Sequence, residues 1–354
     1  MNSARVNNFD LIRLVAALQV LIYHALTHFN LNSVYQDKIK AVISYFPGVP
    51  IFFTISGFLI YKSIERNSHD LKRYFKNRLI RIFPALFICL LFTVILLASS
   101  NELTFPDFFS ASFWLWIAAQ LSIFQFYKMP SLATWGVGHP NGSLWSISVE
   151  LQYYFFLPLL FLSVFKWRKT KLVQNLTFLF LGLLSLVYAS YQKTVILESE
   201  MAGNIMGVIL FNYLYFFCIG ILIYINFEFI SKFLKNKGLF WLVFFVSYTL
   251  IFRNWLGLFD NIYEVSAYGF LGATLLGIAT ISLTYTAPSL SNKLLRGNDI
   301  SYGMYIFHMP IFNYFINQQK EISWEKLIFI CAIVICVAYL SWRFIEKKML
   351  QFKV

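Results

Sequence analysis

Long apolar stretches separated by short polar linkers dominate the pattern of this chain. Ten of them have about the length needed to cross a bilayer, since roughly 17 to 25 apolar residues span its hydrocarbon core. They are residues 9–29, 43–62, 80–99, 145–165, 173–192, 205–226, 239–254, 266–285, 301–317 and 326–343. The pattern predicts an all-α, polytopic integral membrane protein with about ten transmembrane helices.

A further apolar stretch, 112–127, is assigned from the distribution of basic residues. Lys and Arg cluster in 62–81, in 166–171 and in the C-terminal tail. Because such clusters concentrate in cytoplasmic loops, all three are predicted to be cytoplasmic, and so are both termini. If 112–127 crossed the membrane, the basic segment 166–171 would lie on the external side, against this rule. We therefore expect 112–127 to form a re-entrant or interfacial helix within an external segment, 100–144.

Composition supports the membrane assignment. Hydrophobic residues make up 59% of the 354 positions and charged residues only 13%, which excludes an ordinary soluble domain. The net charge of +13 then reports membrane orientation and not nucleic-acid binding. The four cysteines lie in apolar stretches without metal-ligand spacing, so they are predicted to pack, and no metal site is expected. The sequence shows no internal repeat, and it predicts a single transmembrane domain over 1–354 with no appended soluble domain.

The first apolar stretch carries ionisable residues that a simple anchor would lack. Arg13 and His24 are eleven positions apart, which is three helical turns plus roughly 20°, so both lie on one face about 16 Å apart along the axis. Charged residues in a span usually face a protein interior or a wet cavity, which makes this face a candidate site. In the alternative interpretation, Asp10 and Arg13 neutralise each other as an i,i+3 pair and His24 only packs.

Two later spans carry further candidates for acid–base chemistry. Glu150 is the only acidic residue well inside a predicted span, about 10 Å below the outer boundary when counted from Ser143, at a depth similar to that of His24. A carboxylate and an imidazole at one level can support each other's charged form. His308 precedes Pro310 in the ninth span and is a secondary candidate. Its structural alternative is a hydrogen bond to a carbonyl that the proline frees.

Two more patterns suggest ligand contacts, and each has a structural alternative. Ser56 and Gly57 in the second span allow close approach by a ligand or, alternatively, by a neighbouring helix. Arg78 and Arg81 are three positions apart before Pro84, a spacing that can bind phosphate through forked hydrogen bonds. Their alternative role is to anchor the cytoplasmic end of the span.

These patterns together resemble a known family. The Arg-x10-His helix and the motifs FFTISGFLI, NRLIRIFP, SLWSISVE and SYGMYIFHMP follow one another between residue 9 and about residue 317. In this combination they resemble the bacterial acyltransferase family 3, whose members are membrane O-acyltransferases that modify cell-surface glycans and other hydroxyl-bearing acceptors. The FDLIR start lacks the glycine often seen there, which leaves the Arg–His pair intact.

The resemblance implies roles for several of these residues. Arg13 and His24 would form the core pair, Glu150 would be a further functional acid, and Arg78 and Arg81 would contact the donor. It also implies a bacterial cytoplasmic (inner) membrane protein whose donor is acyl-CoA, most commonly acetyl-CoA. The acceptor would be a surface polysaccharide or glycolipid.

The residues and the resemblance together predict general-base acyl transfer. His24 removes the proton of an acceptor hydroxyl as that hydroxyl attacks the thioester, and Glu150 orients or charges the imidazole. Ser56 and Gly57 leave room for the pantetheine arm of a CoA that enters from the cytoplasm.

Two other classes of function stay open at this stage. In a transporter or flippase, Arg13, His24 and Glu150 would form a proton or substrate relay without covalent chemistry. A non-catalytic scaffold would instead tolerate the loss of His24.

Overall fold

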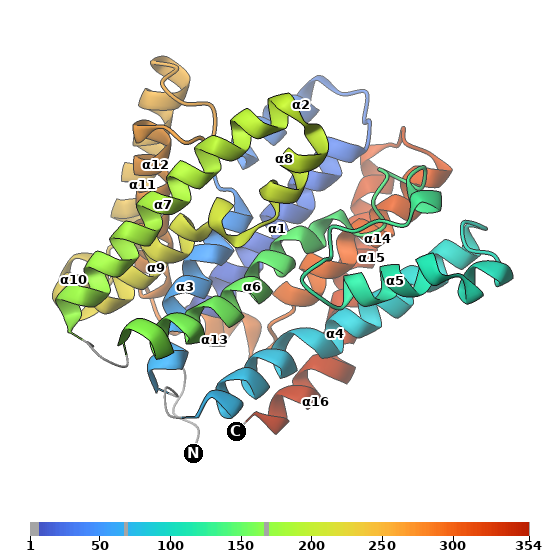
Figure 1. The fold of residues 1–354 in the computed structure, drawn as a ribbon. Helices are drawn as coiled ribbons and strands as arrows, with labels where there is room; N and C mark the ends of the chain where they lie inside the picture. The colour runs from blue at the N-terminus through green and yellow to red at the C-terminus, as the bar shows by residue number, and fades with distance from the viewer. Residues whose placement is uncertain (1–6, 67–69, 166–169, 354) are drawn as a thin grey trace. The chain divides into compact units, whose positions relative to one another are not determined.

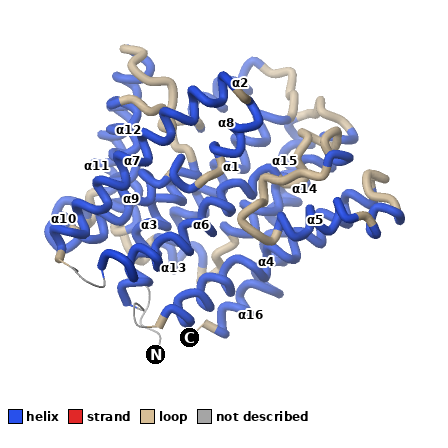
Figure 2. The backbone as a smooth tube through the Cα atoms, in the orientation of Figure 1, coloured by secondary structure: helices blue, strands red, loops and turns tan. Residues whose placement is uncertain are grey.

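The computed structural model describes residues 7–66, 70–165 and 170–353, and within these ranges the chain is helical, with loops and no β-strand (Figures 1 and 2). Part of the basic segment 166–171 lies outside the described residues. The α-helices are α1 (Phe9–His28), α2 (Val34–Ile43), α3 (Gly48–Arg66), α4 (Leu71–Ser99), α5 (Ala111–Gln120), α6 (Trp145–Leu160), α7 (Lys171–Glu198), α8 (Glu200–Gly207), α9 (Leu214–Ile225), α10 (Phe227–Leu234), α11 (Gly238–Thr249), α12 (Ala267–Thr284), α13 (Leu290–Leu295), α14 (Ser301–Gln318), α15 (Trp324–Ser341) and α16 (Lys347–Met349). Short π-helical turns extend three of them, at Phe161–Phe165, Leu250–Trp255 and Trp342–Glu346. Short 3-10 turns lie at Phe105–Phe109, Pro130–Leu132, Gly142–Leu144, Leu210–Asn212 and Leu350–Phe352.

The helices confirm an all-α polytopic membrane protein, although fewer of them than predicted have the length and hydropathy of a span. The described residues hold eight such helices, or nine if the pair α9 and α10, bent by 95°, forms one span. The predicted span 205–226 is divided: α9 has only 12 residues, about 18 Å of helix, which is too short to cross alone. The predicted span 301–317 corresponds to α14, whose length of 18 residues is sufficient. It is not among the eight because its polar residues lower its hydropathy.

The ambiguous stretch 112–127 contains α5, a helix of 10 residues. At 1.5 Å per residue it covers about 15 Å, half the hydrocarbon thickness. The prediction that this stretch does not cross as a helix agrees with the structure.

The chain divides into two compact units, and the division falls within α1, α4 and α6. Unit 1 comprises Met1–Ala16, Tyr45–Tyr74 and Gln152–Gly297. Its centre is α9, which is buried along most of its length and packs against α3, α7 and α12.

Two glycines allow α3 and α9 to pack closely. A Cβ on Gly57 of α3 would stand 2.2 Å from the Phe217 carbonyl oxygen, and one on Gly220 of α9 would stand 2.0 Å from the Thr54 carbonyl oxygen.

Unit 2 comprises Ala17–Ser44, Phe75–Leu151 and Asn298–Val354. Within it α14 packs on α15, and α5 and the segment 129–135 cover the end of α4. The buried cluster there consists of Leu90, Leu97, Leu103, Phe113, Trp116, Met129, Leu132 and Trp135. Rings of α14 also meet rings from two other parts of the chain. Phe312 lies 5.4 Å from Phe29, which directly follows α1, and Phe307 lies 5.7 Å from Phe92 of α4, both between ring centroids. The part of α1 that belongs to unit 2, from Ala17 onward, therefore lies beside α14, and so does the part of α4 in this unit.

Prolines inside helices leave carbonyl groups that need another donor, because a proline has no N–H for the carbonyl four residues earlier. In unit 2, Pro310 frees the carbonyl of Ile306, which accepts from Asn141 Nδ2 at 2.9 Å and from Cys89 Sγ at 3.2 Å. In unit 1, Pro158 frees the carbonyl of Tyr154, which accepts from the Tyr74 hydroxyl at 3.3 Å. Side chains of other segments thus supply the donors that an apolar surrounding cannot.

Candidate active site

Two histidines from distant parts of the sequence meet inside unit 2. Nδ1 of His24, on α1, lies 2.8 Å from Nε2 of His308, on α14, with the ring centroids 5.1 Å apart. His308 is fully buried, and His24 is half-buried. The other ring nitrogen of His308, Nδ1, lies 2.7 Å from the Tyr305 carbonyl oxygen.

The carbonyl fixes the direction of both hydrogen bonds. A carbonyl oxygen only accepts, so Nδ1 of His308 carries the hydrogen, and in the neutral ring Nε2 of His308 carries the lone pair. His24 must then donate from Nδ1 to that lone pair, which places the lone pair of neutral His24 on Nε2. A histidine oriented in this way by a second group is suited to accept a proton at its outer nitrogen.

The segment around His308 is held by hydrogen bonds that leave its position well defined. The Tyr305 hydroxyl lies 2.6 Å from Ser146 Oγ, and the ring of Phe312 meets the His308 ring edge-on at 5.6 Å. Further along α14, the fully buried Asn313 accepts from the Val137 N–H and donates to the carbonyls of His139 and Pro140. Asn313 therefore fastens the loop before α6 to the helix that carries His308.

His308 was expected either to act as a secondary candidate or to bond the carbonyl freed by Pro310. The second expectation is wrong, because that carbonyl is satisfied by Asn141 and Cys89, and His308 contacts His24 instead. The motif SYGMYIFHMP contains the residue, but nothing in the sequence indicates which residue it pairs with.

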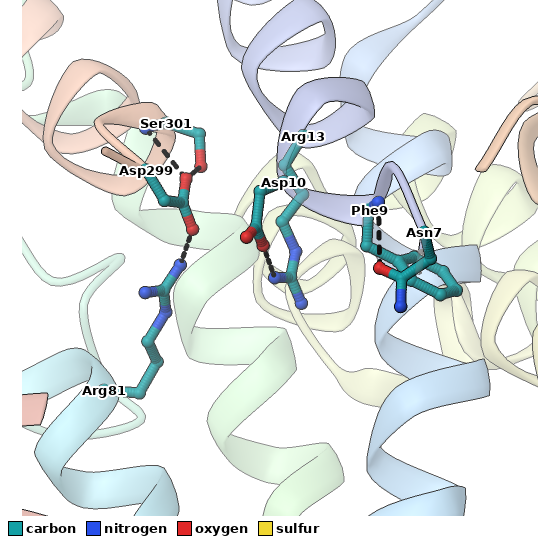
Figure 3. Close-up of polar contacts among 7 residues, drawn as sticks. All are labelled: Asn7, Phe9, Asp10, Arg13, Arg81, Asp299 and Ser301. Carbon is teal, nitrogen blue, oxygen red and sulfur yellow. Dashed lines mark hydrogen bonds and ion pairs between the residues drawn. The ribbon is translucent and has the colours of Figure 1, made fainter. Parts of the chain in front are cut away.

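A second polar cluster of unit 2 lies where α14 begins. Arg81 Nη2 of α4 donates to Asp299 Oδ2 at 2.5 Å, and the other oxygen of Asp299 accepts from Ser301 Oγ at 2.5 Å and from the Ser301 N–H at 3.3 Å (Figure 3). The side chain of Asp299 is 7% exposed and that of Arg81 20%. The sequence analysis selected Arg81 but not Asp299, which lies in the linker before the ninth predicted span.

Arg13 lies in unit 1, where Nη1 donates to Asp10 Oδ1 at 3.5 Å (Figure 3). Both side chains are about a quarter exposed, at 22% and 25%, so this long i,i+3 contact adds little stability. It agrees with the alternative in which the two charges offset each other. The predicted pairing of Arg13 with His24 in one site stays a prediction.

The remaining predicted residues take the following positions. Glu150 is half-buried on α6, and Arg78 is half-buried on α4, one turn before Arg81. Ser56 is buried on α3, and the space beside Gly57 is filled by the backbone of α9, which supports the packing alternative for that glycine. The acid role of Glu150 and the donor roles of Arg78, Ser56 and Gly57 stay predictions.

All four cysteines are free thiols; Cys89 and Cys218 are buried, as expected for packing residues, whereas Cys331 is partly buried and Cys336 is exposed. Among the residues that the structure describes, no group of three or more His, Cys, Asp or Glu side chains has the arrangement of a metal site.

Helices that can span a membrane and a pair of hydrogen-bonded histidines characterise an integral membrane protein with a candidate site for proton transfer. The family model described as "Acyltransferase domain" matches residues 6–343, and the chain belongs to this family of acyltransferases. Membership in an enzyme family favours the enzyme over the transporter and scaffold alternatives.

Relatives with curated names resemble the chain over most of its length. It is 28% identical to Nodulation protein 10 of Rhizobium leguminosarum bv. viciae, over 99% of this chain and 95% of that protein. It is 26% identical to the O-acetyl transferase of Shigella phage Sf6, over 97% of this chain and 96% of that protein. With Peptidoglycan O-acetyltransferase OatA of Listeria monocytogenes it shares 27% identity over 96% of this chain, which corresponds to 55% of OatA. No solved structure shows significant similarity to the chain.

Proposed function

We propose that this protein is a membrane O-acetyltransferase that moves an acetyl group from cytoplasmic acetyl-CoA to a hydroxyl of an extracytoplasmic glycan or glycolipid. Two of the relatives named above are O-acetyltransferases, and one of these is named for peptidoglycan. The acceptor class proposed here is accordingly a sugar hydroxyl of a cell-surface polymer or of its lipid-linked precursor.

The observation that carries the chemical proposal is the relay from the Tyr305 carbonyl through His308 to His24. It orients His24 so that Nε2 presents a lone pair. Proton transfer at Nε2 then gives an imidazolium whose Nδ1–H remains hydrogen-bonded to His308. Such an orienting partner is the usual requirement for a histidine base in acyl transfer.

The reaction proceeds by direct transfer in this proposal. His24 Nε2 takes the proton of the acceptor hydroxyl while the hydroxyl oxygen forms a bond to the thioester carbonyl carbon. The carbon–sulfur bond then breaks, the thiolate of CoA leaves, and the proton from His24 passes to it. The products are an O-acetyl ester and free CoA. Glu150 acts in the proposal as a further acid that favours the charged form of the imidazole.

The donor would be bound by Arg78 and Arg81, whose guanidinium groups suit the phosphates of CoA. In the proposed topology this end of α4 lies on the cytoplasmic side, because the sequence around it is rich in Lys and Arg. The thioester would reach His24 through the protein interior, and the acceptor would approach from the external side.

Sealed vesicles of opposite orientation test the proposal directly. Inside-out vesicles that contain the protein are supplied with acetyl-CoA labelled in the acetyl group, and label is counted in the polysaccharide and glycolipid fractions before and after mild alkali, which cleaves O-acetyl esters. We expect alkali-labile label when the donor meets the cytoplasmic face, and loss of that label in vesicles carrying His24→Ala. Right-side-out vesicles supplied from outside should stay unlabelled.

Two results would contradict this proposal. Equal labelling of sealed right-side-out vesicles would exclude a cytoplasmic donor site. Full labelling by His24→Ala would exclude His24 as the base.

A further inference from the structure

We propose that Asp299 is a positioning residue for donor binding, which holds the Arg81 guanidinium in the orientation that receives a phosphate group of CoA. This inference rests on the proposed function, because it assumes that Arg81 belongs to the donor site. It adds a residue that neither the sequence patterns nor the resemblance selected.

The geometry gives Asp299 a fixed position. Both of its carboxylate oxygens are engaged, Oδ2 by Arg81 and Oδ1 by the hydroxyl and N–H of Ser301 (Figure 3). Because the side chain is almost fully buried at 7% exposure, water competes little for these hydrogen bonds. The carboxylate is thereby attached to the first turn of α14 and presents one oxygen to α4.

The arginine gains orientation from this contact. A guanidinium is a planar fork of five N–H donors, and its value for phosphate recognition depends on the direction in which the fork points. A long side chain that samples several rotamers loses entropy when a ligand immobilises it. A fixed carboxylate on one edge of the fork reduces this cost.

The same contact connects two parts of the proposed reaction. Asp299 lies two residues before α14, and His308 follows Ser301 by seven residues on that helix, about 10 Å along its axis. A second hydrogen bond connects α14 with α4 close to the Asp299–Arg81 contact: the Tyr302 hydroxyl donates to the Ile82 carbonyl at 3.1 Å. Tyr302 therefore offers a matched control, because its hydroxyl connects α14 to α4 through a backbone carbonyl.

The test is binding of CoA itself to the purified full-length protein in lipid nanodiscs, measured by isothermal titration calorimetry. The variants are Asp299→Asn, Ser301→Ala, Arg81→Ala and Tyr302→Phe, each checked for folding by its thermal unfolding midpoint. We expect Asp299→Asn to raise the Kd for CoA about tenfold, comparable to Arg81→Ala. Without the carboxylate charge, Arg81 is no longer oriented for its charge-assisted contact with the phosphate. Ser301→Ala should raise the Kd by a smaller factor, and Tyr302→Phe should leave it unchanged.

A second readout separates positioning from mere stability. With acetyl transfer as the assay, Asp299→Asn should raise KM for acetyl-CoA and leave kcat near that of the wild type, and it should add nothing to KM in the Arg81→Ala background. Ser301→Ala keeps the proposal testable if Asp299→Asn does not fold.

The outcomes are distinguishable from failure of the proposed function. If the wild type does not bind CoA, the donor assignment is wrong. If the wild type binds CoA and Asp299→Asn binds it equally well or more tightly, Asp299 is only a counter-charge and the inference is overturned. An equal increase in the Kd for CoA in Tyr302→Phe would also overturn it, because loss of any hydrogen bond between α4 and α14 would then weaken CoA binding.

Discussion

His24 and His308 are 284 positions apart in the sequence, yet Nδ1 of the first lies 2.8 Å from Nε2 of the second. The Tyr305 carbonyl behind His308 sets the direction of this hydrogen bond and so decides which nitrogen of His24 can accept a proton. In the proposed function, this hydrogen bond orients His24 as the base.

The first prediction concerns this relay. His24→Ala should lower kcat for acetyl transfer by about 10² to 10⁴, the usual contribution of a general base. His308→Ala should lower kcat by a smaller factor, since His24 remains but loses its orienting partner. The double variant should be no slower than His24→Ala, because residues that act as a unit are non-additive. Initial rates of the purified variants at saturating donor provide the measurement.

The matched control for the relay is His28→Ala. His28 follows His24 by one turn of α1, with ring centroids 5.6 Å apart, and it is not part of the relay. It should retain a rate near that of the wild type. A loss as large as that of His24→Ala would show that the assay responds to any change in this part of α1.

The second prediction concerns Glu150. Glu150→Gln keeps the size of the side chain and removes its charge, so it should lower kcat and leave KM for acetyl-CoA unchanged if the carboxylate supports the imidazolium. Arg78→Ala should show the opposite pattern, a higher KM with strong dependence on salt, because phosphate contacts are screened by ions. Steady-state kinetics at two salt concentrations separates the two. A change in KM alone for Glu150→Gln would remove it from the chemical step.

The third prediction concerns topology. In a background without the native cysteines, single cysteines at Lys128 and Lys193 should react with a membrane-impermeant maleimide in intact cells. A cysteine at Arg73 should react only after permeabilisation, because that segment is predicted to be cytoplasmic. All three positions are exposed, so burial does not limit the labelling. Reaction at Arg73 in intact cells would reverse the orientation on which the donor side depends.

The fourth prediction concerns the contact between α3 and α9. Gly57→Ala would place a methyl carbon 2.2 Å from the Phe217 carbonyl oxygen, so the helices must separate. We expect a loss of about 1 to 3 kcal/mol or more in stability from this overpacking, seen as a lower unfolding midpoint in detergent. Gly182→Ala on α7 is the control, since its Cβ would meet Cys218 Cβ at an ordinary 3.7 Å. It should be neutral or stabilising, because alanine favours the helix. Equal midpoints for the two variants would contradict the packing role of Gly57.

The sequence by itself determined the class of the protein and part of its candidate chemistry. Apolar stretches of span length require helices in a bilayer, because every backbone polar group must there be satisfied within its own segment. Ionisable residues in such stretches are costly, so His24 could be recognised as a candidate from its position alone. The distribution of basic residues identified the stretch 112–127 as one that does not cross, because a crossing there would place the basic segment 166–171 outside.

The tertiary structure decided what these residues meet. The sequence spacing relates Arg13 to His24 on one helix. It holds no signal that His24 pairs with His308 or that Arg81 pairs with Asp299, because each pair joins segments of unit 2 that are far apart in the sequence. Local hydropathy also predicted an unbroken span at 205–226, whereas the structure starts α9 at Leu214 within a buried core. Close contacts such as that of Gly57 with α9 depend on which helices are neighbours, and only the packed chain specifies that.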